Sequence, residues 1–145
     1  SKSRKFIGIG NPITSQELLE LPGDIIVPAA IEEVITRKNA YNIKAKIILE
    51  MANGPTTSEA DELLHNKGVV VIPDILANSG GVTVSCFEWE QNLHSEHWNK
   101  EEVNTKLKQK MEMAVAPIWE TAQKEHVDLR TAAFAVALER ILGAM

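Results

Sequence analysis

Three short apolar runs stand out in the first half of the chain, and segments with helical spacing separate them. The runs cover residues 24–30, 45–52 and 69–74 and are rich in isoleucine and valine. Short, nearly continuous apolar runs bounded by Gly, Pro and Asn predict strands that are buried on both faces. Because such strands alternate here with helical segments, the pattern predicts a parallel sheet and the α/β class.

The segments around these runs predict short helices with recognisable start signals. Thr14 and Glu17 have the spacing of a capping box. Thr56 or Thr57 is expected to cap another helix, and Glu59 would complete a box with Thr56. The expected helices cover residues 14–21, 31–37 and 56–65.

The second half of the chain contains helical patterns only. Residues 82–93 have no internal breaker, and apolar side chains recur at helical spacing over residues 103–122. Asp128 is placed to cap a last helix. Sheets usually contain about five or six strands, so the three expected here look like one half of a larger sheet. One outer strand should therefore expose a hydrophobic edge, which predicts self-association.

The composition excludes several classes of function without selecting one. The chain has 145 residues, a net charge of −5 and no basic stripe, which argues against binding to nucleic acid or to an anionic membrane. No apolar run approaches the ~18–20 residues that a membrane-spanning helix needs. The single cysteine, Cys86, fits a reducing compartment, and a cytoplasmic location is expected. His94 and His97 have no third ligand nearby, so no metal site is expected.

Polar residues follow two of the predicted strands. Asn53 and Gly54 come after the second strand, and Asn78 comes after the third. In open α/β sheets ligands bind at the carboxyl ends of strands, where an Asn side chain can bond an amide or a ribose hydroxyl. Val82 and Ser85 lie three residues apart in the next helix, so both can shape one pocket for a carboxylate on a short aliphatic stem. Turns and helix caps explain the same residues equally well, and the residues alone leave both interpretations open.

Longer motifs give the chain a family resemblance. From about residue 9 onwards, the sequence resembles the C-terminal part of glutamate dehydrogenases, within the group that acts on glutamate, leucine, phenylalanine or valine. The motifs are PAA (residues 28–30), AKII (45–48), ANGPTTSEAD (52–61), VIPDILANSGGVTVSCFEW (71–89) and DLRTAAFAVALERI (128–141). Their length and order make the match specific, and ANGPTT and GGVTVS are more similar to the glutamate branch.

The resemblance implies a fold and an activity. Residues 1–78 would be the second half of a Rossmann-like domain that binds NAD or NADP, and residues 79–145 would be C-terminal helices that pack across the interdomain hinge. The reaction would convert glutamate to 2-oxoglutarate and ammonia, with hydride passing to a nicotinamide, in a homo-oligomer. By the family pattern, two groups of residues line the site: Ala29, Ala30, Asn53 and Asn78 on the cofactor side, and Val82 and Ser85 at the substrate side chain.

The resemblance also implies that the chain is part of a larger enzyme. The family's catalytic Lys and Asp, and its glycine-rich phosphate-binding fingerprint, have no match here, so no catalytic residue is assigned and the isolated chain is expected to be inactive. Two other interpretations stay open. The chain could belong to a branched-chain or aromatic amino-acid dehydrogenase, or it could be a non-catalytic nucleotide-binding or scaffold domain.

Overall fold

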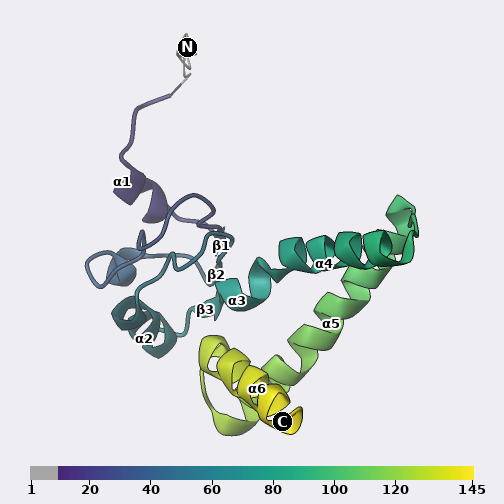
Figure 1. The fold of residues 1–145 in the computed structure, drawn as a ribbon. Coiled ribbons are helices and arrows are strands. Elements are labelled where there is room, and N and C mark those ends of the chain that lie inside the picture. Colours follow the sequence, from purple (N-terminus) through teal and green to yellow (C-terminus); the bar gives the residue numbers. More distant parts are fainter. Residues whose placement is uncertain (1–9) are drawn as a thin grey trace.

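A computed structural model describes residues 10–145 and shows a small parallel sheet joined to a long helical extension (Figure 1). The strand order is β1-β2-β3, and both pairs are parallel, as the sequence predicts. The strands are shorter than the apolar runs that contain them: β1 (Ile25–Ile26), β2 (Ile47–Leu49) and β3 (Val70–Ile72).

The helices fall into short ones around the sheet and long ones beyond it. In Figure 1, α4 runs outward from α3, α5 runs back from the far end of α4, and α6 packs against the returning end of α5. The helices are α1 (Ser15–Leu19), a 3-10 helix (Ala40–Asn42), α2 (Ser58–Asn66), α3 (Asp74–Ala77), α4 (Ser79–His94), α5 (Lys100–Glu125) and α6 (Leu129–Gly143). No helix within residues 10–145 is long and apolar enough to cross a membrane.

The helix starts follow the capping signals of the sequence, with one correction. Thr14 and Glu17 form the expected capping box at α1. At α2 the cap is Thr57, whose hydroxyl accepts a bond from the Ala60 amide. The expected box between Thr56 and Glu59 is therefore wrong, and the buried Thr56 hydroxyl has no hydrogen-bond partner among residues 10–145.

The expected helix over residues 31–37 is also wrong, because a pairing with a distant segment takes its place. Ile35 donates its amide to the Pro55 carbonyl at 2.9 Å and accepts from the Thr57 amide at 2.9 Å. The two segments form a parallel bridge between Ile35 and Thr56, and Ile35 is completely buried. These residues have the apolar spacing of a helix but adopt an extended conformation, because tertiary contacts override the local preference.

The third strand connects to the helical arms through two helices in succession. The sequence predicts one helix over residues 82–93, whereas the chain enters α3 one residue after β3, and α4 begins at Ser79. Asn78 is both the last cap of α3 and the first cap of α4. The side chain of Asn78 is therefore held at a junction between two rigid elements.

Two hydrophobic cores stabilise the chain. The first lies between the sheet, α2 and the loops beside them, and includes Ile35, Ile48 and Leu64, all completely buried. The second joins α3, α5 and α6, and its buried residues are Leu76, Ile118, Ala122, Ala132, Ala133 and Val136. On the other side of the sheet, β1 pairs only with β2 among residues 10–145, and Ile25 is 56% exposed, so the expected hydrophobic edge is present.

Candidate functional site

The two asparagines that follow the strands meet at the carboxyl edge of the sheet. The Asn78 side-chain amide donates to the Asn53 side-chain oxygen at 2.8 Å, across 25 positions of sequence. Asn53 is exposed and Asn78 is half-buried. Ligands bind at this edge in open α/β sheets, so the pair lies where the sequence pattern predicts a site.

The end of the first strand lies beside the same edge. The Pro28 carbonyl accepts bonds from the amides of Met51 at 3.0 Å and Ala52 at 2.9 Å, which extends the pairing beyond β1. Ala29 and Ala30, which follow, are both exposed. Ala30 and Asn53 line one pocket of about 460 Å³, together with Ile31, Glu32, Met51 and Ala52.

The two residues predicted to meet the substrate lie further along α4. Val82 is 65% exposed, and the exposed Ser85 hydroxyl donates to the Gly81 carbonyl at 3.3 Å. At 1.5 Å per helical residue, they lie roughly 6 and 10 Å beyond Asn78 along the axis. Among residues 10–145, no hydrogen bond joins the side chain of Val82 or Ser85 to the asparagine pair. The structure therefore brings Ala30, Asn53 and Asn78 to one edge of the sheet, and places Val82 and Ser85 on the helix that begins there.

The paired glycines at the start of α4 face different surroundings. A Cβ atom on Gly80 would lie 3.8 Å from Leu107 and 3.9 Å from Met111, because α5 packs against this side. A Cβ atom on Gly81 would meet nothing within 4 Å. The open face of α4 therefore begins at Gly81, and Ser85, one helical turn later, shares that face.

A charged cluster that the sequence did not predict lies close to this edge of the sheet. Arg130 of α6 donates to three carboxylates, which lie directly after β2, in α2 and in α3. Its contacts are Nη2 with both oxygens of Glu50 at 2.8 Å, Nε with Asp61 at 2.6 Å, and Nη1 with Asp74 at 3.0 Å. Glu50 is completely buried, and its side chain also accepts from the Asp74 amide at 2.8 Å. An acidic residue at the end of an apolar strand was the one signal in the sequence that could have pointed to the cluster.

The pKa values of Asp74 and Asp61 are shifted in opposite directions. Burial alone would raise the pKa of Asp74, but bonds from the Gly54 and Ile75 amides and the charge of Arg130 hold the pKa below its usual value. For Asp61, burial outweighs the attraction of Arg130, and the nearby carboxylates of Asp128 and Glu50 add to the effect, so its pKa is raised.

These opposite shifts predict opposite changes in the pH dependence of stability. Asp74 contributes its full stability to the fold above the pKa that it has in the unfolded chain, and this stability is lost as the pH falls through its pKa in the folded chain. Asp61 contributes its full stability below its pKa in the unfolded chain, and this stability is lost as the pH rises through its pKa in the folded chain. Between about pH 7 and about pH 3, Asp74→Asn should therefore lose less free energy of unfolding on acidification than the unmodified chain, and Asp61→Asn should lose more. Urea unfolding across this pH range measures both, and a change of the same sign in the two variants would contradict the assignment.

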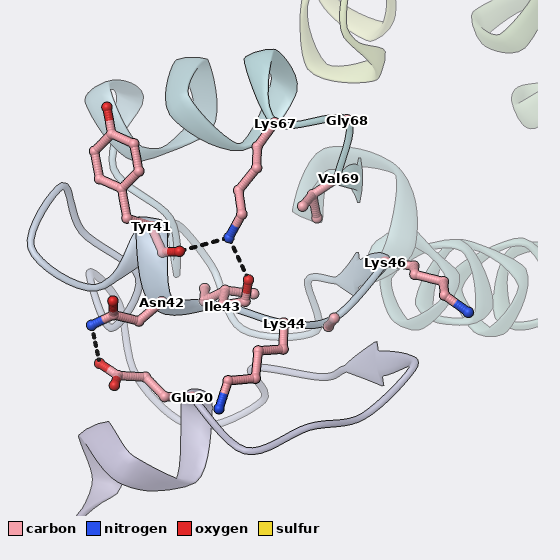
Figure 2. Close-up of a pocket in the computed structure, with 10 residues that line it drawn as sticks. Glu20, Tyr41, Asn42, Ile43, Lys44, Lys46, Lys67, Gly68 and Val69 are labelled. Carbon is pink, nitrogen blue, oxygen red and sulfur yellow. Dashed lines mark hydrogen bonds between the residues drawn. The ribbon is translucent and has the colours of Figure 1, made fainter.

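A pocket of about 770 Å³ lies at the opposite edge of the sheet, before β2 and β3 begin. Figure 2 shows that the Lys67 side chain crosses it and donates to the carbonyls of Tyr41 at 2.7 Å and Ile43 at 2.5 Å. Asn42 bonds Glu20 at 3.1 Å in the same region. These contacts tie loops together at the amino ends of the strands, so the candidate site remains at the carboxyl edge despite the smaller pocket there.

Comparison with known proteins identifies the family of the chain. The family model for glutamate/leucine/phenylalanine/valine dehydrogenase matches residues 3–145. The NAD-specific glutamate dehydrogenase of Staphylococcus aureus (strain COL) is 50% identical over 128 residues, which are 88% of this chain and 31% of that protein. This chain therefore spans about a third of the length of the curated relatives that it matches.

Solved structures show the same fold. The glutamate dehydrogenase of Peptoniphilus asaccharolyticus has a TM-score of 0.78 at 44% identity, covering 82% of this chain and 30% of that one. The hetero-hexameric glutamate dehydrogenase of Thermus thermophilus, in its Leu-bound form, has a TM-score of 0.85 at 33% identity. The match covers 90% of this chain and 31% of that one. A parallel sheet of this kind, with its candidate site at the carboxyl edge, places the chain in the class of Rossmann-type domains. More narrowly, the chain belongs to the glutamate/leucine/phenylalanine/valine dehydrogenase family.

Proposed function

We propose that this chain is part of an NAD-dependent glutamate dehydrogenase and forms one wall of its cofactor and substrate cleft. The observation that carries the proposal is the bond between Asn53 and Asn78 at the carboxyl edge of the sheet, in a chain half identical to an NAD-specific glutamate dehydrogenase. The reaction of the whole enzyme would convert glutamate to 2-oxoglutarate and ammonia. NAD, when bound, would accept the hydride from the glutamate α-carbon.

The residues at this edge suit a nicotinamide nucleotide. After the bond between the two asparagines, the Asn53 amide nitrogen can still donate and the Asn78 side-chain oxygen can still accept. The carboxamide of a nicotinamide ring has an N–H group that needs an acceptor and a carbonyl oxygen that needs a donor, and the two asparagines offer one of each. Ala29 and Ala30 are small and exposed, so they leave room for a flat ring beside the backbone.

The open face of α4 suits the substrate side chain. Val82 offers an apolar surface, and Ser85 offers a hydroxyl three residues later. The Ser85 hydroxyl bonds its own helix at 3.3 Å, a long distance for an O–H donor, so it can turn to donate to a carboxylate. We assign Val82 to the aliphatic stem of glutamate and Ser85 to its distal carboxylate.

The rest of the architecture fits a role within a larger assembly. We propose that residues 1–78 belong to the nucleotide-binding domain and that residues 79–145 form a helical segment that packs across the hinge. We also propose a homo-oligomer; a solved relative is hetero-hexameric, so assembly of six subunits occurs among its relatives. In the isolated chain, the exposed edge at β1 favours association.

The isolated chain should not oxidise glutamate, because the lysine and aspartate that transfer protons in the family have no match in this sequence. Production of NADH from glutamate, followed by absorbance, should stay at the level of the blank. As a control, a chimera should be built in which this chain replaces the matching segment of the Staphylococcus aureus enzyme. Clear turnover by the isolated chain would contradict the proposal that it forms only one wall of the site.

A further inference from the structure

The asparagine pair depends on a single residue beneath it, Asp74. The Asp74 side chain accepts from the Gly54 amide at 2.8 Å, which fixes the residue directly after Asn53. The Asp74 carbonyl accepts from the Asn78 amide at 3.1 Å. Gly54 has a φ of +53°, a left-handed conformation that a bond from its amide helps to hold. Asp74 therefore sets the backbone on both sides of the bond between Asn53 and Asn78.

Asp74 is itself held by α6, a helix far away in the sequence. Arg130 Nη1 donates to Asp74 at 3.0 Å, and Nη2 holds the buried Glu50, whose carboxylate accepts from the Asp74 amide. The side chain of Arg130 is only 23% exposed, and the N–H groups of its planar guanidinium can donate to several carboxylates at once. Leu76, two residues after Asp74, is buried in the helical core, so α6 holds α3 by both charge and packing.

We propose that Arg130 is a positioning residue, which fixes the Asn53–Asn78 pair through Asp74 and Glu50 and thereby couples the helical segment to the cofactor edge. The functional part of this inference rests on the function proposed above. Asp61 provides an internal comparison, since it bonds Arg130 at 2.6 Å but belongs to α2 and has no bond to Gly54 or to either asparagine.

The structural test uses amide hydrogen exchange and NMR on the 145-residue chain. Arg130→Lys keeps the positive charge but removes the planar guanidinium group that binds several carboxylates at once. Asp74→Asn is a second, milder variant, which removes the charge of the carboxylate. In both, exchange at Gly54 should accelerate about tenfold, the effect of losing roughly one hydrogen bond, and the Asn78 side-chain amide signals should shift. Val70, whose amide bonds the Lys46 carbonyl at 2.9 Å at the opposite edge, reports overall stability and should change less. The control Asp61→Asn should leave Gly54 and Asn78 unchanged.

Two results would overturn the proposal. In the first, the Gly54 amide and the Asn78 side-chain signals stay unchanged in both variants. In the second, Gly54 and Val70 accelerate equally in both variants, which would show that Arg130 acts only on global stability.

The functional test uses the chimera and separates this inference from the proposed function. Arg130→Lys should raise the KM for NAD by about tenfold while Asp61→Asn does not, and Asn53→Ala and Asn78→Ala should raise it as well. If the asparagine variants behave like the unmodified chimera, the proposed function of this edge is wrong. If the asparagine variants lose affinity but Arg130→Lys does not, the positioning role is wrong.

Discussion

Replacing Arg130 by glutamine is expected to lower the free energy of unfolding by about 3–5 kcal/mol, because it leaves a buried carboxylate without its partner. Glu50 is completely buried and takes two bonds from Arg130 at 2.8 Å. Glutamine is shorter and neutral, so it cannot replace the fork that reaches three carboxylates. Urea unfolding at neutral pH measures the difference directly.

The matched control lies on the same helix. Arg140 is exposed, and Arg140→Gln removes the same charge, so its free energy of unfolding should change by no more than ~0.5 kcal/mol. The double variant Arg130→Gln with Glu50→Gln removes the unpaired charge and should recover part of the loss. Equal stability of the Arg130→Gln and Arg140→Gln variants would show that the cluster does not stabilise the fold.

Replacing Ser85 by alanine in the chimera is expected to lower kcat/KM for glutamate by roughly 10- to 150-fold. A hydrogen bond to a charged group is worth about 1.5–3 kcal/mol, which corresponds to that range. The use of norvaline, which has no distal carboxylate, should change little. Steady-state rates with both substrates therefore separate loss of the carboxylate contact from general damage.

A hydroxyl elsewhere on α4 provides the control. Thr83 bonds the Ser79 carbonyl at 2.9 Å within its own helix, and Thr83→Val should leave the ratio of glutamate to norvaline unchanged. An enzyme specific for branched-chain or aromatic amino acids would not need the Ser85 hydroxyl. Unchanged use of glutamate by the Ser85→Ala chimera would therefore contradict the assignment of this residue.

Local patterns in the sequence predict the parts of the fold that local forces decide. The three apolar runs become parallel strands in chain order, and Thr14, Thr57 and Asp128 cap helices because their side chains bond amides a few residues away. The segment around Ile35 differs, since its partners are Pro55 and Thr57 on a loop some 20 residues away. Its apolar spacing could not reveal that pairing.

The candidate site shows the same division. Polar residues after two strands predict that Asn53 and Asn78 lie at one edge of the sheet, because parallel strands end there. The bond between the two side chains was not predicted and comes from the structure. The Arg130 cluster was missed because its partners Asp74 and Glu50 lie 56 and 80 positions away. Only the packing of α6 brings those charges together, and no local spacing in the sequence records it.

The most direct test of the proposed function is glutamate-dependent NADH production by the chimera. If this chain forms the cofactor and substrate wall of a glutamate dehydrogenase, a chimera that assembles like its Staphylococcus aureus parent should reduce NAD with glutamate, and Asn78→Ala should weaken NAD binding. A chimera that folds and assembles like the parent but produces no NADH would contradict the claim.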